Sequence, residues 1–292
     1  MTVSDSEVLA AIEAHGSQRK AAAALGLDRR TVERRLARMG REPGAPRVLI
    51  IDIETRPMLV YCWGMFKQYI SPQQVKDWGG VMTVAAKWHG DDDVMFRAEW
   101  GKGGKEGMIR WALGLLDEAD AVVGWNSQKF DTRKLNAEFQ RFRMRRPTPY
   151  RHVDLMRSQK RDADFPSNKL ESRRLIHGRE GKLDTGGFPL WVGAMNGDRD
   201  CRRLMQEYNC QDVLITENEF DEMRAGGWVR NLPNLSLYGG HVCPNCGSGK
   251  LQAHKPYRAE TRRYALWVCQ DCGTASRAVK CEPGFASLKA VA

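Results

Sequence analysis

Two acidic residues end an apolar stretch near residue 50. Residues 48–51 are Val-Leu-Ile-Ile, and Asp52 and Glu54 follow on either side of Ile53. An apolar run of this kind predicts a buried strand, and side chains two positions apart on a strand project from the same face. Two neighbouring carboxylates are costly to bury unless a cation lies between them, and hard divalent cations prefer oxygen ligands. The alternative interpretation is a strand whose acidic end reaches solvent.

Two later stretches carry further polar residues, one at a predicted strand end and helix start and the other on one face of a predicted helix. Asn126 ends an apolar strand, and Asp131 falls in the first turn of the helix predicted to follow it. Tyr208 and Asp212 lie four positions apart on a long helix predicted over residues 200–223, so they share one face of that helix. Taken singly, Asp131 could be a helix-start acid and Tyr208 an ordinary core aromatic.

Taken in this order and on these elements, the three stretches resemble the three Exo motifs of the DnaQ-like, or DEDD, 3′–5′ exonucleases. The Tyr-x-x-x-Asp form of the third motif is similar to the DEDDy branch, which includes family B polymerase proofreading domains and RNase D. The resemblance implies an α/β domain over residues 47–225, with an RNase H-like mixed sheet flanked by helices. Strands alternating with helices along this part of the chain agree with that fold class.

The resemblance also assigns roles to the acids. Asp52 would bridge two Mg²⁺ or Mn²⁺ ions, Glu54 and Asp212 would complete the first ion's ligands, and Asp131 would hold the second ion. Tyr208 would orient the attacking water. Two such ions supply both the activated water and the charge stabilisation that phosphodiester hydrolysis needs.

Two further residues near the second motif need an assignment. Asn126 would contact substrate or support the site. Asp154 also ends a predicted strand and competes with Asp131 for the role of third acid. The Asn-x-x-x-Phe pattern before Asp131 favours Asp131, so Asp154 is expected to be structural.

Residues 1–42 predict three short helices that resemble a helix-turn-helix. The third helix begins at Asp28 and is rich in arginine, and its Arg30 and Arg34 lie four positions apart. Such a helix is suited to the DNA backbone or major groove. The alternative is a small helical module that docks a protein. Residues 40–46, rich in Gly and Pro, are expected to link this part to the next.

Residues 240–281 hold two Cys-x-x-Cys pairs in a stretch with few apolar residues. The pairs are Cys243 with Cys246 and Cys269 with Cys272. Four thiolates at this spacing predict a closed tetrahedral Zn²⁺ site that substitutes for a core too small to fold alone. This segment is similar to a zinc ribbon.

Composition limits the partners. The 292 residues carry a formal net charge of +10, which suits a polyanion such as nucleic acid. Apolar runs fall short of the roughly 20 residues that a membrane span needs, and the N-terminus lacks a signal-peptide pattern. A cytoplasmic protein with no membrane partner is therefore expected.

One aromatic stretch has no place in the motifs. Tyr61, Trp63, Phe66 and Tyr69 lie between the first and second predicted strands. Such rings could stack on bases, but packing in the interior is the favoured interpretation.

Together these patterns predict a metal-dependent 3′–5′ exonuclease that hydrolyses DNA 3′ ends by a two-metal-ion mechanism. An exoribonuclease of the RNase D type is the closest alternative, and the helix-turn-helix favours DNA over RNA. A non-catalytic DNA-binding regulator is disfavoured, because all four acids are present. A replication or repair protein is a further expected partner.

Overall fold

The computed structural model describes residues 3, 5–15, 18–28, 31–32, 46–179, 183–284, 286 and 289. The chain divides into two compact units, Met1–Ala45 and Pro46–Ala292. Each unit is described by itself.

The first unit contains two short helices, α1 (Asp5–His15) and α2 (Gln18–Ala24). Its small core consists of Val8 from α1, Ala22 from α2 and Val32, all buried. Ala21 and Ala22 of α2 are buried, and side chains this small allow the helices to approach closely.

A turn follows α2 and leads to the predicted third helix. Gly26 adopts a φ of 65°, which favours glycine. The Asp28 side chain accepts a hydrogen bond of 2.9 Å from the Thr31 amide, as a helix N-cap does. Arg30 and Arg34, predicted to contact DNA, lie outside the described residues.

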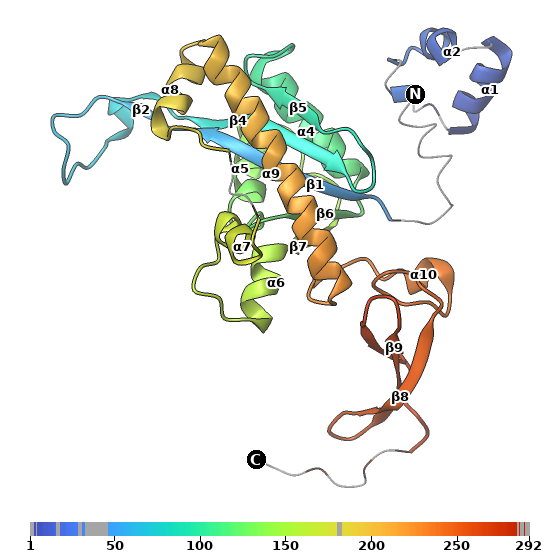
Figure 1. Cartoon of the computed structure of the whole chain (residues 1–292). Helices are drawn as coiled ribbons and strands as arrows, with labels where there is room; N and C mark the ends of the chain where they lie inside the picture. Colours follow the sequence, from blue (N-terminus) through green and yellow to red (C-terminus); the bar gives the residue numbers. More distant parts are fainter. Residues whose placement is uncertain are drawn as a thin grey trace. The chain divides into compact units, whose positions relative to one another are not determined.

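The second unit is built on a five-stranded mixed sheet (Figure 1). The strand order is β5-β4-β1-β6-β7. Strand β1 pairs antiparallel with β4 and parallel with β6, while β4 pairs antiparallel with β5 and β6 pairs parallel with β7. The strands are β1 (Val48–Arg56), β4 (Gly80–Trp88), β5 (Met95–Ala98), β6 (Ala121–Gly124) and β7 (Arg151–Asp154). This is the RNase H-like mixed α/β sheet predicted from the sequence.

Helices cover both faces of the sheet, and the alternation along β1 explains which residues face which layer. Leu49, Ile51 and Ile53 pack in one core with α4 (Gly104–Glu118) and α5 (Asp131–Arg141). These two helices lie behind the sheet in the view of Figure 1.

The opposite face lies against the long helix α9 (Arg199–Ala225), which crosses the sheet in Figure 1. Ile50 of β1 packs there in one buried cluster with Val213 and Phe220 of α9. Residues two and four positions after Ile50 therefore also face α9. They are Asp52 and Glu54.

The remaining elements of the sheet domain are short. They include the helices α6 (Leu155–Asp162), α7 (Leu170–Ile176) and α8 (Phe188–Met195), of which the sequence indicated α6 and α8 nowhere. A two-stranded pair, β2 (Leu59–Val60) and β3 (Val75–Asp77) with the 3₁₀ turn η1 (Pro72–Gln74), lies between β1 and β4.

The favoured interpretation of the aromatic stretch is wrong. Tyr61, Trp63, Phe66 and Tyr69 are 66%, 99%, 81% and 90% exposed. These rings sit on the loop between β2 and β3, and no second layer of the fold covers that loop within the described part of the chain.

The C-terminal segment forms a small three-stranded sheet of order β10-β9-β8. Its strands are β8 (Leu251–Arg258), β9 (Arg263–Cys269) and β10 (Ala275–Arg277), and the short helix α10 (Ser236–Gly239) precedes them. All neighbouring strands in this sheet run antiparallel.

Among the helices that the structure describes, none has the length and apolar character to cross a membrane.

Candidate active site

Three carboxylates meet between β1 and α9. One carboxylate oxygen from each of Asp52, Glu54 and Asp212 lies within 4.8 Å of the other two. Asp52 and Glu54 face α9 because of the alternation along β1, and Asp212 directly precedes Val213, which packs on the same face of the sheet. The sequence predicted all three as members of one site.

Such a group repels itself when ionised. At about 5 Å and an effective dielectric of 20, each pair of charges costs roughly 3 kcal/mol. A divalent cation with a preference for carboxylate oxygen would remove this repulsion, and Mg²⁺ and Mn²⁺ have that preference. The donor set therefore fits a hard divalent metal.

The backbone of β1 changes at this point. Glu54 pairs with Thr83 of β4, but Thr55 pairs with Val81, so the register shifts directly after Glu54. Bulges of this kind bend a strand and redirect its side chains, and they are common beside active sites. On its other side, β1 pairs with β6 only over residues 48–50.

The Asp131 side chain contacts β1 beyond the residues of β1 that pair with β6. The Asp131 carboxylate accepts a hydrogen bond of 3.2 Å from the Ile53 amide, and its residue is only 4% exposed. Burial raises the pKa of Asp131 to about 7, although hydrogen bonds from its own amide and that of Ile53 act in the opposite direction. Asp131 thus lies beside the strand that carries the acidic group but outside the 4.8 Å group itself. A nearby cation would favour its charged form.

Asp154 is bound to backbone on both oxygens. Its Oδ1 accepts hydrogen bonds from the amides of Asn126 and Arg157, at 3.2 and 3.1 Å, and its Oδ2 accepts one of 3.2 Å from Gln128. The bond from Arg157 caps the start of α6. These contacts suit the structural role expected for Asp154.

Asn126 forms the turn between β6 and α5. Its φ is 59°, a left-handed conformation that asparagine tolerates better than most residues. Its carbonyl oxygen accepts hydrogen bonds of 3.1 Å from the amides of both Lys129 and Phe130. Asn126 therefore shapes the turn that brings Asp131 to β1.

Tyr208 lies one turn before Asp212 on α9 and is partly buried. Its ring contacts Trp191 of α8 edge to face, with centroids 6.3 Å apart. The helix α8, which the sequence did not predict, thus supports the tyrosine.

Sequence reasoning assigned no role to Asn209, which contacts the acidic group directly. The Asn209 side chain is fully buried, and its Nδ2 donates a hydrogen bond of 2.7 Å to Oδ2 of Asp52. Its Oδ1 accepts one of 2.8 Å from the Thr83 hydroxyl. The two bonds fix the amide and, through it, one Asp52 oxygen. The only sequence signal for Asn209 was its place next to Tyr208. Helix periodicity alone does not show whether a polar residue at that position is buried in the site or exposed on the surface.

Basic residues line a hollow near Asp154. Its volume is about 260 Å³, and its lining is Gln128, His152, Asp154, Arg157, Ser158, Arg161, Arg230 and Asn231. Arg230 is paired with Asp162, whereas Arg157 and Arg161 form no ion pair with any residue that the structure describes. The hollow lies at the carboxyl end of β7, and Asp52 and Glu54 lie toward the carboxyl end of β1, which runs in the same direction. Both features therefore lie at one edge of the sheet.

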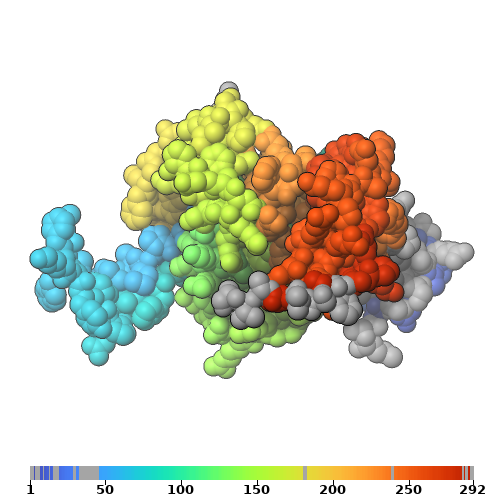
Figure 2. All heavy atoms as spheres, turned by 90° about the horizontal axis from the view of Figure 1, so that it is seen from below, coloured from blue at the N-terminus to red at the C-terminus, as the bar shows by residue number. Residues whose placement is uncertain are grey.

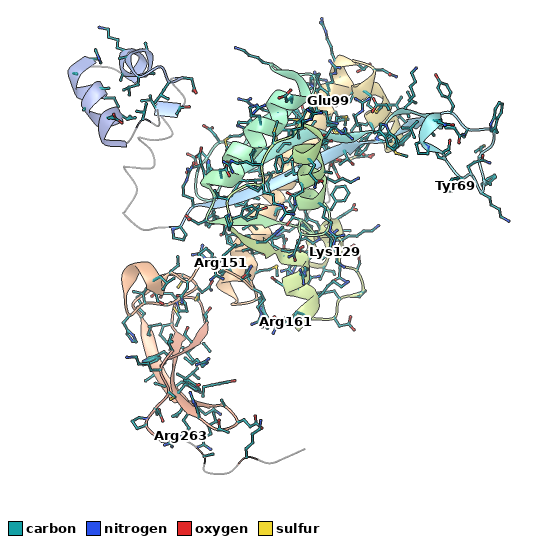
Figure 3. All side chains as sticks on the ribbon, turned by 180° about the vertical axis from the view of Figure 1, so that it is seen from behind. Tyr69, Glu99, Lys129, Arg151, Arg161 and Arg263 are labelled. Carbon is teal, nitrogen blue, oxygen red and sulfur yellow. The ribbon has the colours of Figure 1, made fainter. Side chains whose placement is uncertain are left out.

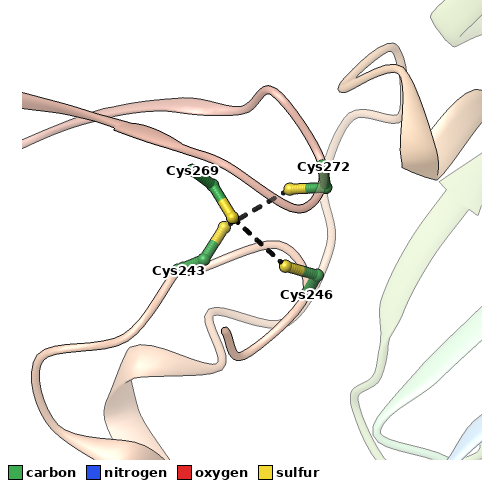
Figure 4. Close-up of side chains that lie close together, drawn as sticks. All are labelled: Cys243, Cys246, Cys269 and Cys272. Carbon is green, nitrogen blue, oxygen red and sulfur yellow. Dashed lines mark hydrogen bonds between the residues drawn. The ribbon is translucent and has the colours of Figure 1, made fainter. Parts of the chain in front are cut away.

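The four C-terminal cysteines converge as the spacing predicts (Figure 4). The sulfurs of Cys243 and Cys272 are 3.6 Å apart, as are those of Cys246 and Cys269. A tetrahedral ion with Zn–S bonds of about 2.3 Å places its sulfurs about 3.8 Å apart, so the cluster fits zinc.

Asn245 connects the cysteine cluster to the end of α9. Its Nδ2 donates to the carbonyl oxygen of Arg224 at 2.8 Å and to Sγ of Cys272 at 3.5 Å. The Arg224 side chain in turn donates to the Asn245 carbonyl oxygen at 3.3 Å. The cluster and the helix are thus joined by reciprocal hydrogen bonds.

Comparisons with known proteins bear on the sheet domain. No curated protein matches the sequence. One similar solved structure is a family B DNA polymerase from the hyperthermophilic archaeon Pyrobaculum calidifontis, with 18% identity and a TM-score of 0.47. The likeness covers 68% of this chain and 26% of the polymerase, so the chain spans about a quarter of that protein's length.

The sequence of residues 76–223 matches the RNase H superfamily. The matched part includes Asp131, Tyr208 and Asp212 and begins after Asp52 and Glu54. It covers half of the chain and contains most of the sheet and α9, and it supports a nuclease that acts on nucleic acid. On this match and on its fold, the chain belongs to the RNase H superfamily.

Proposed function

We propose that this chain is a metal-dependent 3′–5′ exonuclease that hydrolyses phosphodiester bonds at DNA 3′ ends by a two-metal-ion mechanism. The observation that carries the proposal is the group of Asp52, Glu54 and Asp212, which each place one carboxylate oxygen within 4.8 Å of the other two, between an RNase H-like sheet and α9. Carboxylates gathered in this way are the ligands that such a reaction uses.

The proposed ligands follow from the positions of the acids. Asp52, Glu54 and Asp212 would hold one Mg²⁺ or Mn²⁺, Asp52 would be shared with a second ion, and Asp131 would complete the second site. Two ions bound there would lower the pKa of the attacking water and offset the charge on the leaving oxygen.

Protein groups around the acids would orient them and the reactants. Asn209 holds one oxygen of Asp52 through a 2.7 Å hydrogen bond, which restricts the orientation of that carboxylate. Tyr208 would orient the attacking water with its hydroxyl group. Asn126 would support the turn before Asp131 or contact the substrate.

We assign the third acid to Asp131 and not to Asp154. Asp154 already accepts three backbone hydrogen bonds, which fix the β6–α5 turn and the start of α6. Asp131 contacts the same strand as Asp52 and Glu54.

The flanking segments would add affinity for the substrate and its partners. Residues 1–42 would form a DNA-binding helix-turn-helix with Arg30 and Arg34 in contact with duplex DNA, and residues 240–281 would form a ribbon around one structural Zn²⁺. Residues 47–225 would form the exonuclease domain. Arg157 and Arg161 at the same sheet edge as the acids would contact backbone phosphates. A replication or repair protein is the proposed partner.

A direct test uses the full chain with Mg²⁺ and single-stranded DNA and RNA oligomers of matched sequence. Oligomers labelled at the 5′ end should shorten one nucleotide at a time, and those labelled at the 3′ end should release labelled mononucleotide at once. DNA should be cut faster than RNA, and faster cutting of RNA would favour the exoribonuclease. The Asp52→Asn variant should lose nearly all activity, and thermal melting should confirm that it is folded. Internal cutting, or full activity in Asp52→Asn, would overturn the proposal.

A further inference from the structure

An exposed apolar segment projects from the sheet domain and has no role in the proposed chemistry. We call residues 57–79, between β1 and β4, the aromatic arm. Figure 2 shows it, coloured blue to cyan, standing out from the neighbouring surface. Its large apolar side chains that are about half or more exposed are Met58, Leu59, Tyr61, Trp63, Met65, Phe66, Tyr69 and Trp78. Exposed apolar surface gathered to this degree marks an interaction site.

Ion pairs fix the start and the end of the aromatic arm. Arg56, the last residue of β1, pairs with Asp77 at the end of β3 and with Glu99, the latter at 3.1 Å. Figure 3 shows Tyr69 on the arm well away from Glu99. The Asp77 carboxylate also accepts a hydrogen bond of 2.8 Å from the Gly79 amide.

Charged side chains from α4 and α5 bind the returning chain. The Gly79 carbonyl oxygen accepts hydrogen bonds of 3.0 Å from both Lys105 and Arg141. Glu138, whose side chain is 2% exposed, pairs with Lys105 at 3.1 Å and accepts a hydrogen bond of 2.9 Å from the Val81 amide. Buried charges are costly unless fully paired. This network therefore sets the direction in which the arm leaves the sheet.

The arm begins next to the acidic group. Only Thr55 and Arg56 separate Glu54 from the first residue of the arm, so the chain passes from the proposed metal ligands straight into the exposed rings. A polymer whose end lies at Asp52 and Glu54 would have this segment within reach.

Charge and chemistry favour one kind of polymer. The arm contains Lys67 and Lys76, both exposed, and its one acid, Asp77, is paired with Arg56. Exposed rings together with two lysines suit the bases and phosphates of a single strand, because unpaired bases stack on aromatic faces and lysine pairs with phosphate. A second copy of the chain would carry the same net charge of +10, so it is a less favourable occupant for a segment with two exposed lysines than a polyanion.

We propose that the aromatic arm binds single-stranded nucleic acid by stacking unpaired bases on Trp63, Phe66 and Tyr69. The strand is thereby held with its terminal phosphodiester at the acidic group. The proposal deepens the proposed function and rests on it for the direction of the strand.

The test measures binding and chemistry separately on the full chain. Binding to a fluorescent 12-nucleotide single strand is measured by anisotropy with each variant in the Asp52→Asn background, which prevents cleavage without a chelator that would remove zinc from the cysteine cluster. Chemistry is measured with Mg²⁺ on the p-nitrophenyl ester of thymidine 5′-monophosphate, whose single base does not extend to the arm. The variants are Trp63→Ala, Tyr69→Ala, the conservative Trp63→Phe, and Trp228→Ala as an exposed tryptophan outside the arm.

Each alanine variant of the arm should raise the Kd for the single strand roughly 5- to 150-fold. Trp63→Phe should keep most of the affinity, Trp228→Ala should match the wild type, and ester cleavage should be unchanged in all of them. Unchanged single-strand binding in a Trp63→Ala, Tyr69→Ala double variant would overturn the arm's role while leaving the nuclease intact. If sedimentation shows that the wild type self-associates and the arm variants do not, the arm is instead an interface between copies.

The same measurements separate the two proposals. If the wild type fails to cleave either substrate but the arm variants still lose single-strand affinity, the nuclease proposal fails and the binding role stands. If the wild type cleaves the ester but its single-strand binding does not depend on the arm, the binding role fails and the nuclease proposal stands.

Discussion

Replacing Asn209 by alanine removes the hydrogen bond that holds one oxygen of Asp52. The bond joins a neutral amide to a carboxylate at 2.7 Å, with the asparagine side chain fully buried. A hydrogen bond to a charged group contributes about 1.5–3 kcal/mol. The substitution also leaves the Thr83 hydroxyl without its acceptor, so we expect a folding cost of similar size.

The larger effect should fall on metal binding. Groups that orient a metal ligand typically change metal affinity or activity by about 10- to 100-fold when removed. Asn209→Ala should therefore need roughly 10–100 times more Mg²⁺ for half-maximal cleavage, with a smaller change in the rate at saturating metal. The assay is a Mg²⁺ titration of cleavage under single-turnover conditions, with thermal melting to confirm that each variant is folded.

Thr83→Val provides the matched control. It removes the donor to the Asn209 oxygen but leaves the amide free to hold Asp52, so its Mg²⁺ requirement should rise less than that of Asn209→Ala. Adding Thr83→Val to Asn209→Ala should then produce little further change, because the two residues act through one chain of bonds. A folded Asn209→Ala protein with the wild-type Mg²⁺ dependence would refute this reasoning.

Four further predictions concern the proposed site and the flanking segments. Tyr208→Phe should slow cleavage by roughly 10²–10⁴-fold at unchanged Mg²⁺ affinity, because positioning a reacting water contributes about that much, and a normal single-turnover rate would argue against its role. Asp131→Asn should abolish activity in a folded protein, whereas Asp154→Asn should lower the unfolding free energy by about 1–3 kcal/mol and spare turnover. The reverse pattern would identify Asp154 as the third acid. Cys269→Ser should release zinc, measured by elemental analysis, and unfold the ribbon locally, and protein purified without chelators that holds no zinc would contradict the site. Deleting residues 1–42 should weaken duplex DNA binding most at low salt while a short single strand is cut normally, and unchanged duplex affinity would exclude the helix-turn-helix as a DNA contact.

The elements with strong periodicity were predictable from sequence. Alternation placed Asp52 and Glu54 on one face of β1, and four-residue spacing placed Tyr208 and Asp212 on one face of the long helix. Their meeting followed from motif resemblance, since periodicity alone does not show which helix covers which face of a sheet.

Prediction from sequence failed where the local composition of a segment and its position in the folded protein disagree. Helix α8 begins within Gly-Gly-Phe-Pro, which is typical of a loop, and its support of Tyr208 depends on packing. The hydrophobicity of the aromatic side chains near Trp63 predicts that they are buried. The charged network at Arg56 and Glu138 instead holds the arm so that it leaves the sheet and exposes them. That network joins residues from five separate elements, β1, β3, β4, α4 and α5, so no short window of sequence contains its pattern.

The length of α9 has a consequence for how this chain can vary. Its 27 residues form one continuous helix that carries Asp212 and ends at Ala225, directly after Arg224, which Asn245 binds beside the cysteine cluster. Inserting one residue between Asp212 and Arg224 would rotate everything beyond it by about 100° around the helix axis. Relatives that keep both contacts should therefore differ in this span by whole turns, through insertions of three or four residues, or not at all.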